Sequence, residues 1–568
     1  MWFMGFENGD CKDCYACARV CPVHAIKVKD KEAHIMRERC IVCGKCMRVC
    51  PQYAKVKSSV GLIKKFIANN KTVVASVAPS FLAAFGVNSS KLPAALKKLG
   101  FSYVEETIQG IEPLKDIYNI FANDPSDKPY ITSSCPAVVS LVQKHYPQII
   151  PNLIPFISST IAHTRILKQK YGEDCKVIFI GPCLARKVEA HMENSVDVVV
   201  TFLEMEEWLQ NENIKFENLE IIPFDGFKAK SNVLTITGDP IELIKTQNPK
   251  RNIIEVDGVK DCIQVLEGIK RGRFKNALIE MSCCRHKCLQ GVGMTKTYLT
   301  AYEIKEKFYK YATDTKVYNY EYATNLKSYK NISLKKSFEA LNVPLKQPDK
   351  VELKKILNEM GRYKKEDEVN CASCGYYTCR QKAIAVYNGM AEIDMCLPFL
   401  REKAETLTNV IFDTVPEIIV IVDKELNITQ LNNRAKNFFM VTEDVAKGVA
   451  LDKYLDKDIF EKVRDSKQNI IKQKVFVPEY QATMIQSIIW VELNQVLLFF
   501  ADDITENETQ EKKHQQVKYD AINMAQQVIN KQMVVAQQIA SLLGETTGET
   551  KATLTKLKNL IQEEEDRK

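Results

Sequence analysis

Residues 176–189 read KVIFIGPCLARKVE, a short apolar run that ends in a Gly-Pro turn carrying a cysteine. Residues 130–136, YITSSCP, and residues 276–288, NALIEMSCCRHKC, likewise carry cysteines shortly after an apolar run. Such runs are typical of β-strands, and α/β sheets build ligand sites in the loops at the carboxyl ends of parallel strands. A lone cysteine at a strand end is often only buried. Three such loops together predict cysteines that converge on one crevice between two α/β lobes.

The N-terminal region carries one cysteine pattern twice, with spacings of two, two and three residues and a proline after the last cysteine. This is the ligand pattern of a two-cluster ferredoxin, in which the fourth cysteine of each run crosses to the other 4Fe-4S cube. A pair of zinc ribbons is the alternative, but zinc sites seldom show this doubled pattern. We therefore expect one cluster on Cys11, Cys14, Cys17 and Cys50, and the other on Cys21, Cys40, Cys43 and Cys46.

A third cysteine group has spacings of two, four and sixteen residues. Its last cysteine follows an apolar stretch, residues 380–395, that we expect to be helical. The group resembles the small four-cysteine iron-sulfur domain of several anaerobic redox proteins. Four thiolates also suit zinc, but the company of the other motifs favours a third 4Fe-4S cluster. Its ligands would be Cys371, Cys374, Cys379 and Cys396.

Three of the nineteen cysteines are neither in these groups nor among the four ligand candidates of the loops, Cys135, Cys183, Cys284 and Cys288. We expect Cys175 and Cys262 to be small buried hydrophobes, which is the usual role of a free cysteine. Cys283 stands beside a proposed ligand, so a functional role stays open for it.

The bulk composition predicts a cytoplasmic protein. At 568 residues the chain can bury several cores. No apolar stretch reaches the ~18 residues of a membrane span, and no apolar run precedes Cys11, so we expect neither a membrane segment nor a signal peptide. Nineteen cysteines without export signals favour metal ligation over disulfides.

The formal net charge of +8 counts every thiol as neutral. A 4Fe-4S cluster on four thiolates carries about −2, so four clusters would offset about −8. The holoprotein would then be near neutral. No Lys/Arg block with interleaved aromatic residues stands out, and nucleic acid is not an expected partner.

The three cysteine loops resemble the signature loops of the iron-only (FeFe) hydrogenases, and the resemblance covers about residues 1–350, including Val77–Phe81 and Leu99–Phe101. It implies an H-cluster, a 4Fe-4S cube joined through one thiolate to a two-iron subsite with CO, cyanide and a bridging dithiolate. The cofactor would supply the chemistry of H2 oxidation or formation. By position, Cys135, Cys183 and Cys284 would bind the cube, and Cys288 would bridge to the two-iron unit.

The chain departs from catalytic members of that family beside the ligands. Ser134 stands where they carry a proton-relay cysteine. A thiol has a pKa near 8.5 and a hydroxyl one near 15.7, so full deprotonation of serine costs about 10 kcal/mol more. Arg186, followed by Lys187, stands where a lysine is expected. The resemblance makes Ser134, Arg186, Lys187 and Glu189 the candidate catalytic residues.

Two further departures concern the surroundings of the cofactor. Gly181 and Ser282 stand where catalytic members commonly carry methionines. The acidic stretch that is expected upstream of the first loop reads Gly110 to Asp116, and the sequence assigns no proton-route carboxylate within it. Together the changes suggest a site that responds to hydrogen but turns over slowly.

The C-terminal third resembles a PAS domain. A stretch with helical spacing precedes four strand-like runs, and the last run ends in Asp503-Ile504-Thr505. Between residues 403 and 508 there is neither His nor Cys, which removes the usual haem ligand and flavin-adduct thiol. A PAS domain of this kind is more often a coupling or dimerisation module. The expected strands are residues 416–423, 428–432, 488–493 and 496–501.

Residues 506–543 are polar, with apolar positions at heptad spacing that Lys531 and Gln538 interrupt. This pattern fits either an amphipathic helix packed on its own protein or a parallel dimer helix. A final charged helix is expected beyond Gly548.

The predicted fold class is multidomain, α+β and α/β. In chain order we expect a two-cluster ferredoxin-like domain, a two-lobed α/β FeFe-hydrogenase domain, a small four-cysteine Fe-S domain, a PAS domain and a helical signalling or dimerisation segment. Their predicted bounds are residues 1–57, 58–350, 351–402, 403–506 and 507–568.

The architecture resembles the PAS-containing sensory FeFe hydrogenases of anaerobic bacteria. This implies slow H2 oxidation or evolution in an H2 or redox sensor, with a ferredoxin-like electron carrier. Since no histidine-kinase ATP motif is present, we expect a signalling kinase or phosphatase as partner, and a homodimer through the PAS domain and helices stays open. One alternative is a catalytic ferredoxin-linked FeFe hydrogenase. Another is a non-catalytic, hydrogenase-like iron-sulfur assembly protein without the two-iron unit.

Overall fold

The computed structural model describes residues 11–51, 58–226, 241–245, 249–295, 299–313, 332–442, 448–543 and 547–565. The chain divides into two compact units, Met1–Leu400 and Arg401–Lys568, and each is described by itself. Within these described ranges, no helix combines the length and the apolar character that a membrane span requires.

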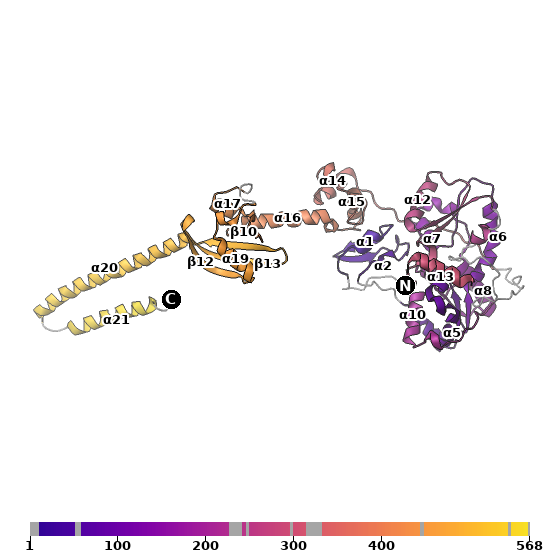
Figure 1. Ribbon diagram of the computed structural model, residues 1–568, viewed down its shortest axis with the longest axis horizontal. Coiled ribbons are helices and arrows are strands. Elements are labelled where there is room, and N and C mark those ends of the chain that lie inside the picture. Colours follow the sequence, from indigo (N-terminus) through magenta and orange to yellow (C-terminus); the bar gives the residue numbers. More distant parts are fainter. Residues whose placement is uncertain are drawn as a thin grey trace. The chain divides into compact units, whose positions relative to one another are not determined.

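Unit 1 begins with the region of the two N-terminal cysteine runs, described over residues 11–51 and called the dicluster region below (Figure 1). Its strands β1 (Ile26–Lys29) and β2 (Glu32–Ile35) form an antiparallel hairpin. Asp30 and Lys31 have positive φ in the two-residue turn, as tight hairpins favour. The short helices α1 (Ala16–Val20) and α2 (Lys45–Arg48) each bury a cysteine, Cys17 and Cys46, at their second position. The third cysteine of each run therefore has the same position in a short helix, and one helix precedes the hairpin in the chain while the other follows it.

Lobe one of unit 1 is a four-stranded parallel sheet in the order β4-β3-β6-β7. Strands β3 and β7 are buried along their whole length, as expected when helices cover both faces of a parallel sheet. The strands are β3 (Val73–Val77), β4 (Tyr103–Glu106), β6 (Lys176–Gly181) and β7 (Val198–Thr201). Helices α3 (Val60–Ala68), α5 (Leu92–Lys98), α8 (Ser159–Tyr171) and α10 (Phe202–Asn211) pack on these strands, and α4 (Phe81–Phe85) lies nearby in the chain.

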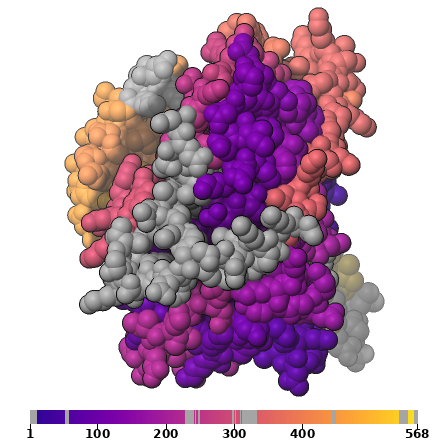
Figure 2. Space-filling model, turned by 90° about the vertical axis from the view of Figure 1, so that its right-hand side faces the viewer, coloured from indigo at the N-terminus to yellow at the C-terminus, as the bar shows by residue number. Residues whose placement is uncertain are grey.

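Lobe two is a three-stranded parallel sheet in the order β5-β9-β8. Its strands are β5 (Tyr130–Ile131), β8 (Asn252–Asp257) and β9 (Ala277–Ser282), and helices α7 (Pro136–His145) and α12 (Val259–Lys270) pack on them. The two parallel sheets confirm the predicted two-lobed α/β architecture. Other helices here include α6 (Glu112–Asn123), α9 (Ala185–Glu193), α11 (Ile241–Lys245), η5 (Lys287–Gln290) and α13 (Ala301–Thr313). Figure 2 turns the side that bears α6 and α8 in Figure 1 toward the reader, and purple and magenta segments of the two lobes make up much of that surface.

The four-cysteine region consists of α14 (Lys350–Glu359), α15 (Cys379–Tyr387) and the short helix η8 (Ile393–Met395). The helix expected over residues 380–395 is interrupted, because Gly389 adopts a positive φ of 62° and turns the chain after α15. The region shares a buried apolar cluster with the dicluster region, in which Val28 and Tyr376 take part. The Val28 amide also donates to the Met390 carbonyl oxygen at 3.2 Å.

Helix α16 (Leu397–Thr414) leads into unit 2, whose five-stranded antiparallel sheet has the order β11-β10-β14-β13-β12. In chain order this is 2-1-5-4-3, the strand order of a PAS domain, and helices α17 (Asn433–Phe439) and α19 (Lys457–Ser466) accompany it. The strands are β10 (Ile418–Asp423), β11 (Ile428–Leu431), β12 (Ile470–Val477), β13 (Ala482–Val491) and β14 (Val496–Asp503). The first, second and last strands agree with the sequence expectation, β13 begins earlier than expected, and β12 has no counterpart among the expected strands.

The chain ends in the helices α20 (Thr505–Leu543) and α21 (Thr547–Glu565), which confirm the expected C-terminal helices. The Asp-Ile-Thr motif joins α20 to the sheet, because the Thr483 amide on β13 donates to Thr505 Oγ1 at 2.8 Å. Val517, Met524, Val528 and Val535 on α20 are each more than half exposed. The described part of the chain therefore leaves these apolar positions of α20 uncovered.

Candidate metal centre

The three cysteine loops line one pocket. The first and third loops follow β5 and β9, neighbours in lobe two, and the second follows β6 of lobe one. The pocket is partly open to solvent and lies between the ends of the three loops. Its lining includes Ser134, Cys135, Cys183, Arg186, Cys283, Cys284 and Cys288.

The cysteines of this pocket are close enough to perturb one another. Burial raises the pKa of the Cys183 thiol to about 11, and the neighbouring Cys135 adds to the rise. Burial is the main cause that raises the pKa of Cys284 well above its usual range, and the neighbouring Cys183, Cys288 and Cys135 add to the rise. Three of the four thiols, those of Cys183, Cys284 and Cys288, have raised pKa values, so a strongly cationic ligand is needed for all four to become thiolates together. The donor set therefore fits an iron-sulfur cube.

Cys283, for which the sequence leaves a functional role open, lies in the same pocket and is buried. A hydrogen bond with Cys283 is the main cause that lowers the pKa of Cys135 to about 6. The same hydrogen bond, followed by burial, raises the pKa of Cys283 well above its usual range. Cys283 is thus the neighbour that most favours the thiolate form of a candidate cluster ligand. Its position directly before Cys284 is the only sequence signal for this contact.

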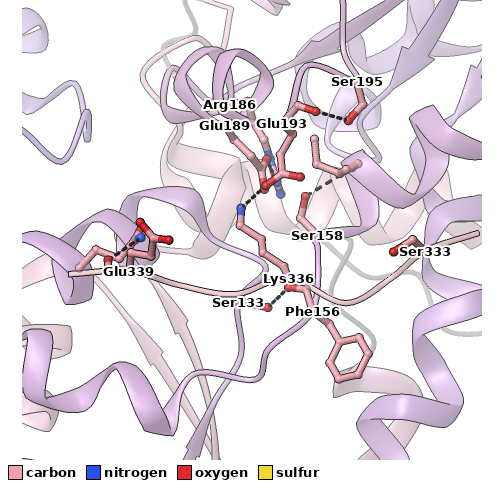
Figure 3. A network of polar contacts seen from close by, with 12 residues as sticks. Ser133, Phe156, Ser158, Arg186, Glu189, Glu193, Ser195, Ser333, Lys336 and Glu339 are labelled. Atoms are coloured by element: carbon pink, nitrogen blue, oxygen red, sulfur yellow. Dashed lines mark hydrogen bonds and ion pairs between the residues drawn. The ribbon is translucent and has the colours of Figure 1, made fainter. Parts of the chain in front are cut away.

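Arg186 joins the first two loops. From α9 its Nη2 donates to the Ser134 carbonyl oxygen at 2.8 Å, and its Nη1 contacts Glu189 Oε2 at 2.5 Å. Both side chains of this ion pair are buried, and Figure 3 shows the two lying together. Burial lowers the pKa of Arg186, but Glu189 and then Cys183 outweigh it and raise the pKa overall. A fixed positive charge therefore faces the cysteines of the pocket.

The other two candidate catalytic residues do not line this pocket. Lys187 reaches Glu204 Oε1 at 2.9 Å, and Glu204 in turn caps α10 through Thr201. Glu189 lies behind Arg186, in a second hollow that Glu193 and Lys336 also line. Figure 3 shows Lys336 reaching Glu193, at 2.8 Å. Lys187 is thus placed in a structural ion pair, and Glu189 holds Arg186.

Ser134 is buried, and the Tyr118 hydroxyl lies 3.4 Å from its Oγ. Tyr118 is on α6, the helix that begins at Glu112 and so contains most of the acidic stretch 110–116. The side chains that α6 buries are Leu114, Tyr118 and Ala122, whereas Asp116 is exposed. This helix consequently presents a phenol to Ser134.

The glycine at position 181 is explained by packing. A Cβ atom there would lie 2.7 Å from Phe179 Cε1 and 3.0 Å from Ala78 Cβ. The Phe179 ring therefore occupies the space that a larger residue at this position would need. Ser282, the second residue in place of a methionine, is buried and lines the pocket.

The dicluster cysteines are grouped as the crossed pattern requires. Burial raises the pKa of Cys17 to about 12, and the cysteines that add to the rise are Cys11, Cys14 and Cys50. Burial also raises the pKa of Cys46, with Cys43, Cys40 and Cys21 as the leading neighbours. Each fourth cysteine thus lies with the other run, which suits two 4Fe-4S cubes.

One of these groups adjoins the pocket of the three loops. Cys43 lines that pocket, and it also contributes to the raised pKa of Cys284. Two contacts fasten the dicluster region there. Arg48 Nη2 donates to the Gln290 carbonyl oxygen at 3.0 Å, and Lys144 Nζ donates to the Cys40 carbonyl oxygen at 2.7 Å. A cluster on Cys21, Cys40, Cys43 and Cys46 would therefore be the neighbour of the pocket.

Comparison with protein families agrees with this geometry. Residues 71–292 match the model of the iron only hydrogenase large subunit, C-terminal domain. The chain contains an iron-only hydrogenase domain. Before this hydrogenase domain, residues 3–64 match a 4Fe-4S dicluster domain, and after it residues 367–398 match an Fe-S cluster domain. These matches cover all three cysteine sets of the sequence.

Relatives of the hydrogenase domain include proteins with two different roles. The chain is 23% identical over 351 residues to the cytosolic iron-sulfur assembly component 3 of Bos taurus, covering 47% of this chain and 73% of that protein. It is also 23% identical over 298 residues to iron hydrogenase 1 of Clostridium pasteurianum, covering 42% of this chain but only 52% of that enzyme.

Solved structures give weaker likenesses. An apo FeFe-hydrogenase from Chlamydomonas reinhardtii is 15% identical, with a TM-score of 0.40, and covers 50% of this chain and 100% of its own. The PAS domain of nitrogen regulation protein NR(II) from Vibrio parahaemolyticus is 18% identical, with a TM-score of 0.15, and covers 17% of this chain and 98% of its own. The domain assignment rests on the family matches and the strand order.

Proposed function

We propose that this chain binds and slowly oxidises or evolves H2 at an H-cluster and reports the result through its PAS-like region to a signalling partner. The observation that carries the proposal is the pocket of Cys135, Cys183, Cys284 and Cys288, which adjoins a second set of cluster ligands through Cys43. When bound, the H-cluster supplies the chemistry of H2 cleavage. The chain's own residues hold it, exclude water and connect it to electron carriers.

Slow turnover is expected from the groups beside the ligands. A catalyst needs a group that takes and gives a proton at the pocket. The hydroxyls of Ser134 and Tyr118 lie together at that point, and serine and tyrosine hydroxyls ordinarily ionise well above neutral pH. Arg186 keeps a permanent positive charge, so it can donate hydrogen bonds to anionic ligands of the cofactor but cannot act as a base.

The reporting role is supported by the regions on the C-terminal side of the hydrogenase domain. A ferredoxin-linked catalyst has no use for a PAS-like region and a long helix, whereas a sensor needs an output. The uncovered apolar positions of α20, among them Val517 and Val528, favour pairing with a second copy or a partner helix. The partner would be a kinase or phosphatase, and a ferredoxin-like protein would exchange electrons with the dicluster region.

A second candidate function is suggested by the iron-sulfur assembly proteins among the relatives. That function is an iron-sulfur assembly role without a two-iron unit. Against it stands the complete eight-cysteine dicluster pattern, which provides an electron route to the pocket.

The test is reduction of the clusters by H2. In full-length protein matured with the two-iron unit, H2 alone should produce the electron paramagnetic resonance signals of reduced 4Fe-4S clusters, with slow H2 evolution from a strong reductant. Wild-type evolution at about 10² turnovers per second or more, which is the upper part of the usual enzyme range, would favour a catalytic hydrogenase. Cluster signals that chemical reductant produces but H2 does not would favour the assembly role.

A further inference from the structure

The four-cysteine region buries two cations beside its candidate ligands. Lys382 lies on α15, three residues after Cys379, and is 0% exposed. Its Nζ donates to the Ile393 carbonyl oxygen at 2.9 Å. Arg362 is 5% exposed, and its Nη2 lies 4.0 Å from Cys396 Sγ. Two positive charges are thus held out of water next to the cysteines of this region.

The electrostatics agree with this placement. Burial lowers the pKa of Lys382, and the groups that oppose the change most are Cys374 and Cys396. Asp394 also opposes it, but Asp394 is exposed and its charge is screened by water. A buried cation is costly unless an anion lies near it. A 4Fe-4S cluster on four thiolates is such an anion, at about −2.

The dicluster region lacks this feature. Among its described residues, 11–51, no Lys or Arg is buried. Arg39 lies near Cys21, Lys45 near Cys43, and Lys144 at the Cys40 carbonyl oxygen, and each of these cations is only partly buried. Because reduction adds one negative charge to a cluster, a buried cation favours the reduced form and raises the midpoint potential. The two dicluster clusters and the four-cysteine cluster should therefore differ in potential, with the four-cysteine cluster reduced first.

Electrons can reach that cluster from the dicluster region. The Tyr376 ring stacks on His24 with centroids 4.9 Å apart, and both Cys374 and Cys21 contribute to the raised pKa of Tyr376, after burial. Gly375, with φ of +90°, lets the backbones approach closely, since a Cβ atom there would lie 3.0 Å from the Ala18 carbonyl oxygen. The two regions that carry the ligands are thus in direct packing contact.

We propose that the four-cysteine cluster is the electron store of this chain, with a midpoint potential held above those of both dicluster clusters by the charges of Lys382 and Arg362. An electron taken from H2 would settle there. Its ligand Cys396 directly precedes α16, so the added charge lies at the start of the helix that leads to unit 2. Only the source of the electron rests on the proposed function.

The test is a chemical redox titration of the reconstituted full-length chain, followed by electron paramagnetic resonance. The signal of the four-cysteine cluster is assigned by its change in Cys371→Ala. Lys382→Met should lower the reduced-to-oxidised ratio of that cluster at fixed potential by about tenfold, which is about 59 mV for one electron. Lys382→Arg, which keeps the charge, should stay near wild type.

Arg380→Gln is the matched control, because Arg380 lies on the same helix but is half exposed and paired with Glu368. It should shift the ratio less than twofold. Arg362→Met serves as a second test if Lys382→Met fails to take up its cluster. The proposal is overturned if the wild-type cluster titrates at or below the dicluster clusters, or if loaded Lys382→Met and Arg362→Met behave like Arg380→Gln. Because the reductant is chemical, a failure of H2 sensing would not affect this result.

Discussion

Arg186 Nη2 donates to the Ser134 carbonyl oxygen at 2.8 Å, so two positions at which the sequence departs from the expected loop pattern are in direct contact. The same guanidinium is held from behind by Glu189 at 2.5 Å. The Arg186 guanidinium, which carries the positive charge of the pocket, therefore also fixes the backbone of the first loop. A change at either position should affect the other.

Restoring a thiol beside the first ligand should speed the chemistry. We expect Ser134→Cys to raise H2 evolution at least tenfold, because a thiol with a pKa near 8.5 exchanges protons near neutral pH and a hydroxyl does not. The rate is measured with a chemical reductant in protein matured with the two-iron unit. Ser133→Cys is the control, since Ser133 does not line the pocket and binds the Phe156 carbonyl oxygen at 2.8 Å. Equal rates in wild type and Ser134→Cys would show that proton relay here is not limiting.

Breaking the buried ion pair should destabilise the hydrogenase domain. Glu189→Gln leaves the buried Arg186 without its carboxylate, and removing one partner of such a pair costs about 3–5 kcal/mol. Thermal unfolding of the apoprotein should show a clearly lower midpoint. The loss should be smaller in loaded protein, because an anionic cofactor would then offset the charge of Arg186.

The control for that variant is Glu212→Gln. Glu212 pairs with Lys64 at the surface, where both side chains are exposed by two fifths or more. Exposed pairs contribute little, so its midpoint should stay close to wild type. Similar midpoints for the two variants would mean that the Arg186–Glu189 pair does not stabilise the pocket.

The crossed assignment of the dicluster ligands predicts different results for two cysteine variants. Cys21→Ala should remove the cluster next to the hydrogenase pocket, and Cys50→Ala should remove the other. Each variant should lose one signal in electron paramagnetic resonance. Only Cys21→Ala should interrupt electron flow between H2 and the remaining clusters, because Cys43 of the same group lines the pocket. If Cys50→Ala were the one to interrupt it, the order of the clusters would be reversed.

Asn432 offers a way to weaken the PAS-like region alone. It is buried, accepts from the Ile419 and Ala435 amides at 3.0 and 2.9 Å, and donates to the Glu417 carbonyl oxygen at 2.8 Å. Asn432→Ala removes a helix cap worth about 0.5–2 kcal/mol and leaves buried groups unsatisfied at about 1–3 kcal/mol more. Hydrogen exchange of β10 and β14 in the full-length chain should accelerate.

The exposed cap Asp456 of α19 provides the comparison, and Asp456→Ala should change exchange much less. In both variants H2 should still reduce the clusters, since the hydrogenase domain is a separate unit from the sheet. A loss of H2-driven reduction in Asn432→Ala would mean that the two functions are not separable.

Much of the fold could be predicted from cysteine spacing and apolar runs, because cluster ligands and buried parallel strands leave strong local patterns. Strand β12 could not, since most of its residues are exposed and Ile470–Val477 includes three polar residues in a row. The helix expected up to residue 395 ends early at Gly389, whose backbone freedom overrides the apolar pattern.

The site shows the same division. The convergence of Cys135, Cys183 and Cys284 could be predicted from their places after strands. The Lys187–Glu204 pair could not, because its partners are distant in sequence, whereas the three-residue spacing of Arg186 and Glu189 is a helical ion-pair signal. Buried Lys382 carries no sequence signal at all, since a lysine on a helix is usually solvated.

We expect the four loop cysteines to hold a complete H-cluster that responds to hydrogen. Infrared spectroscopy of full-length protein, produced with the maturation enzymes, tests it most directly. We predict bands of bound CO and cyanide whose frequencies shift when argon is replaced by H2. Protein with all its 4Fe-4S clusters but without such bands would contradict the account.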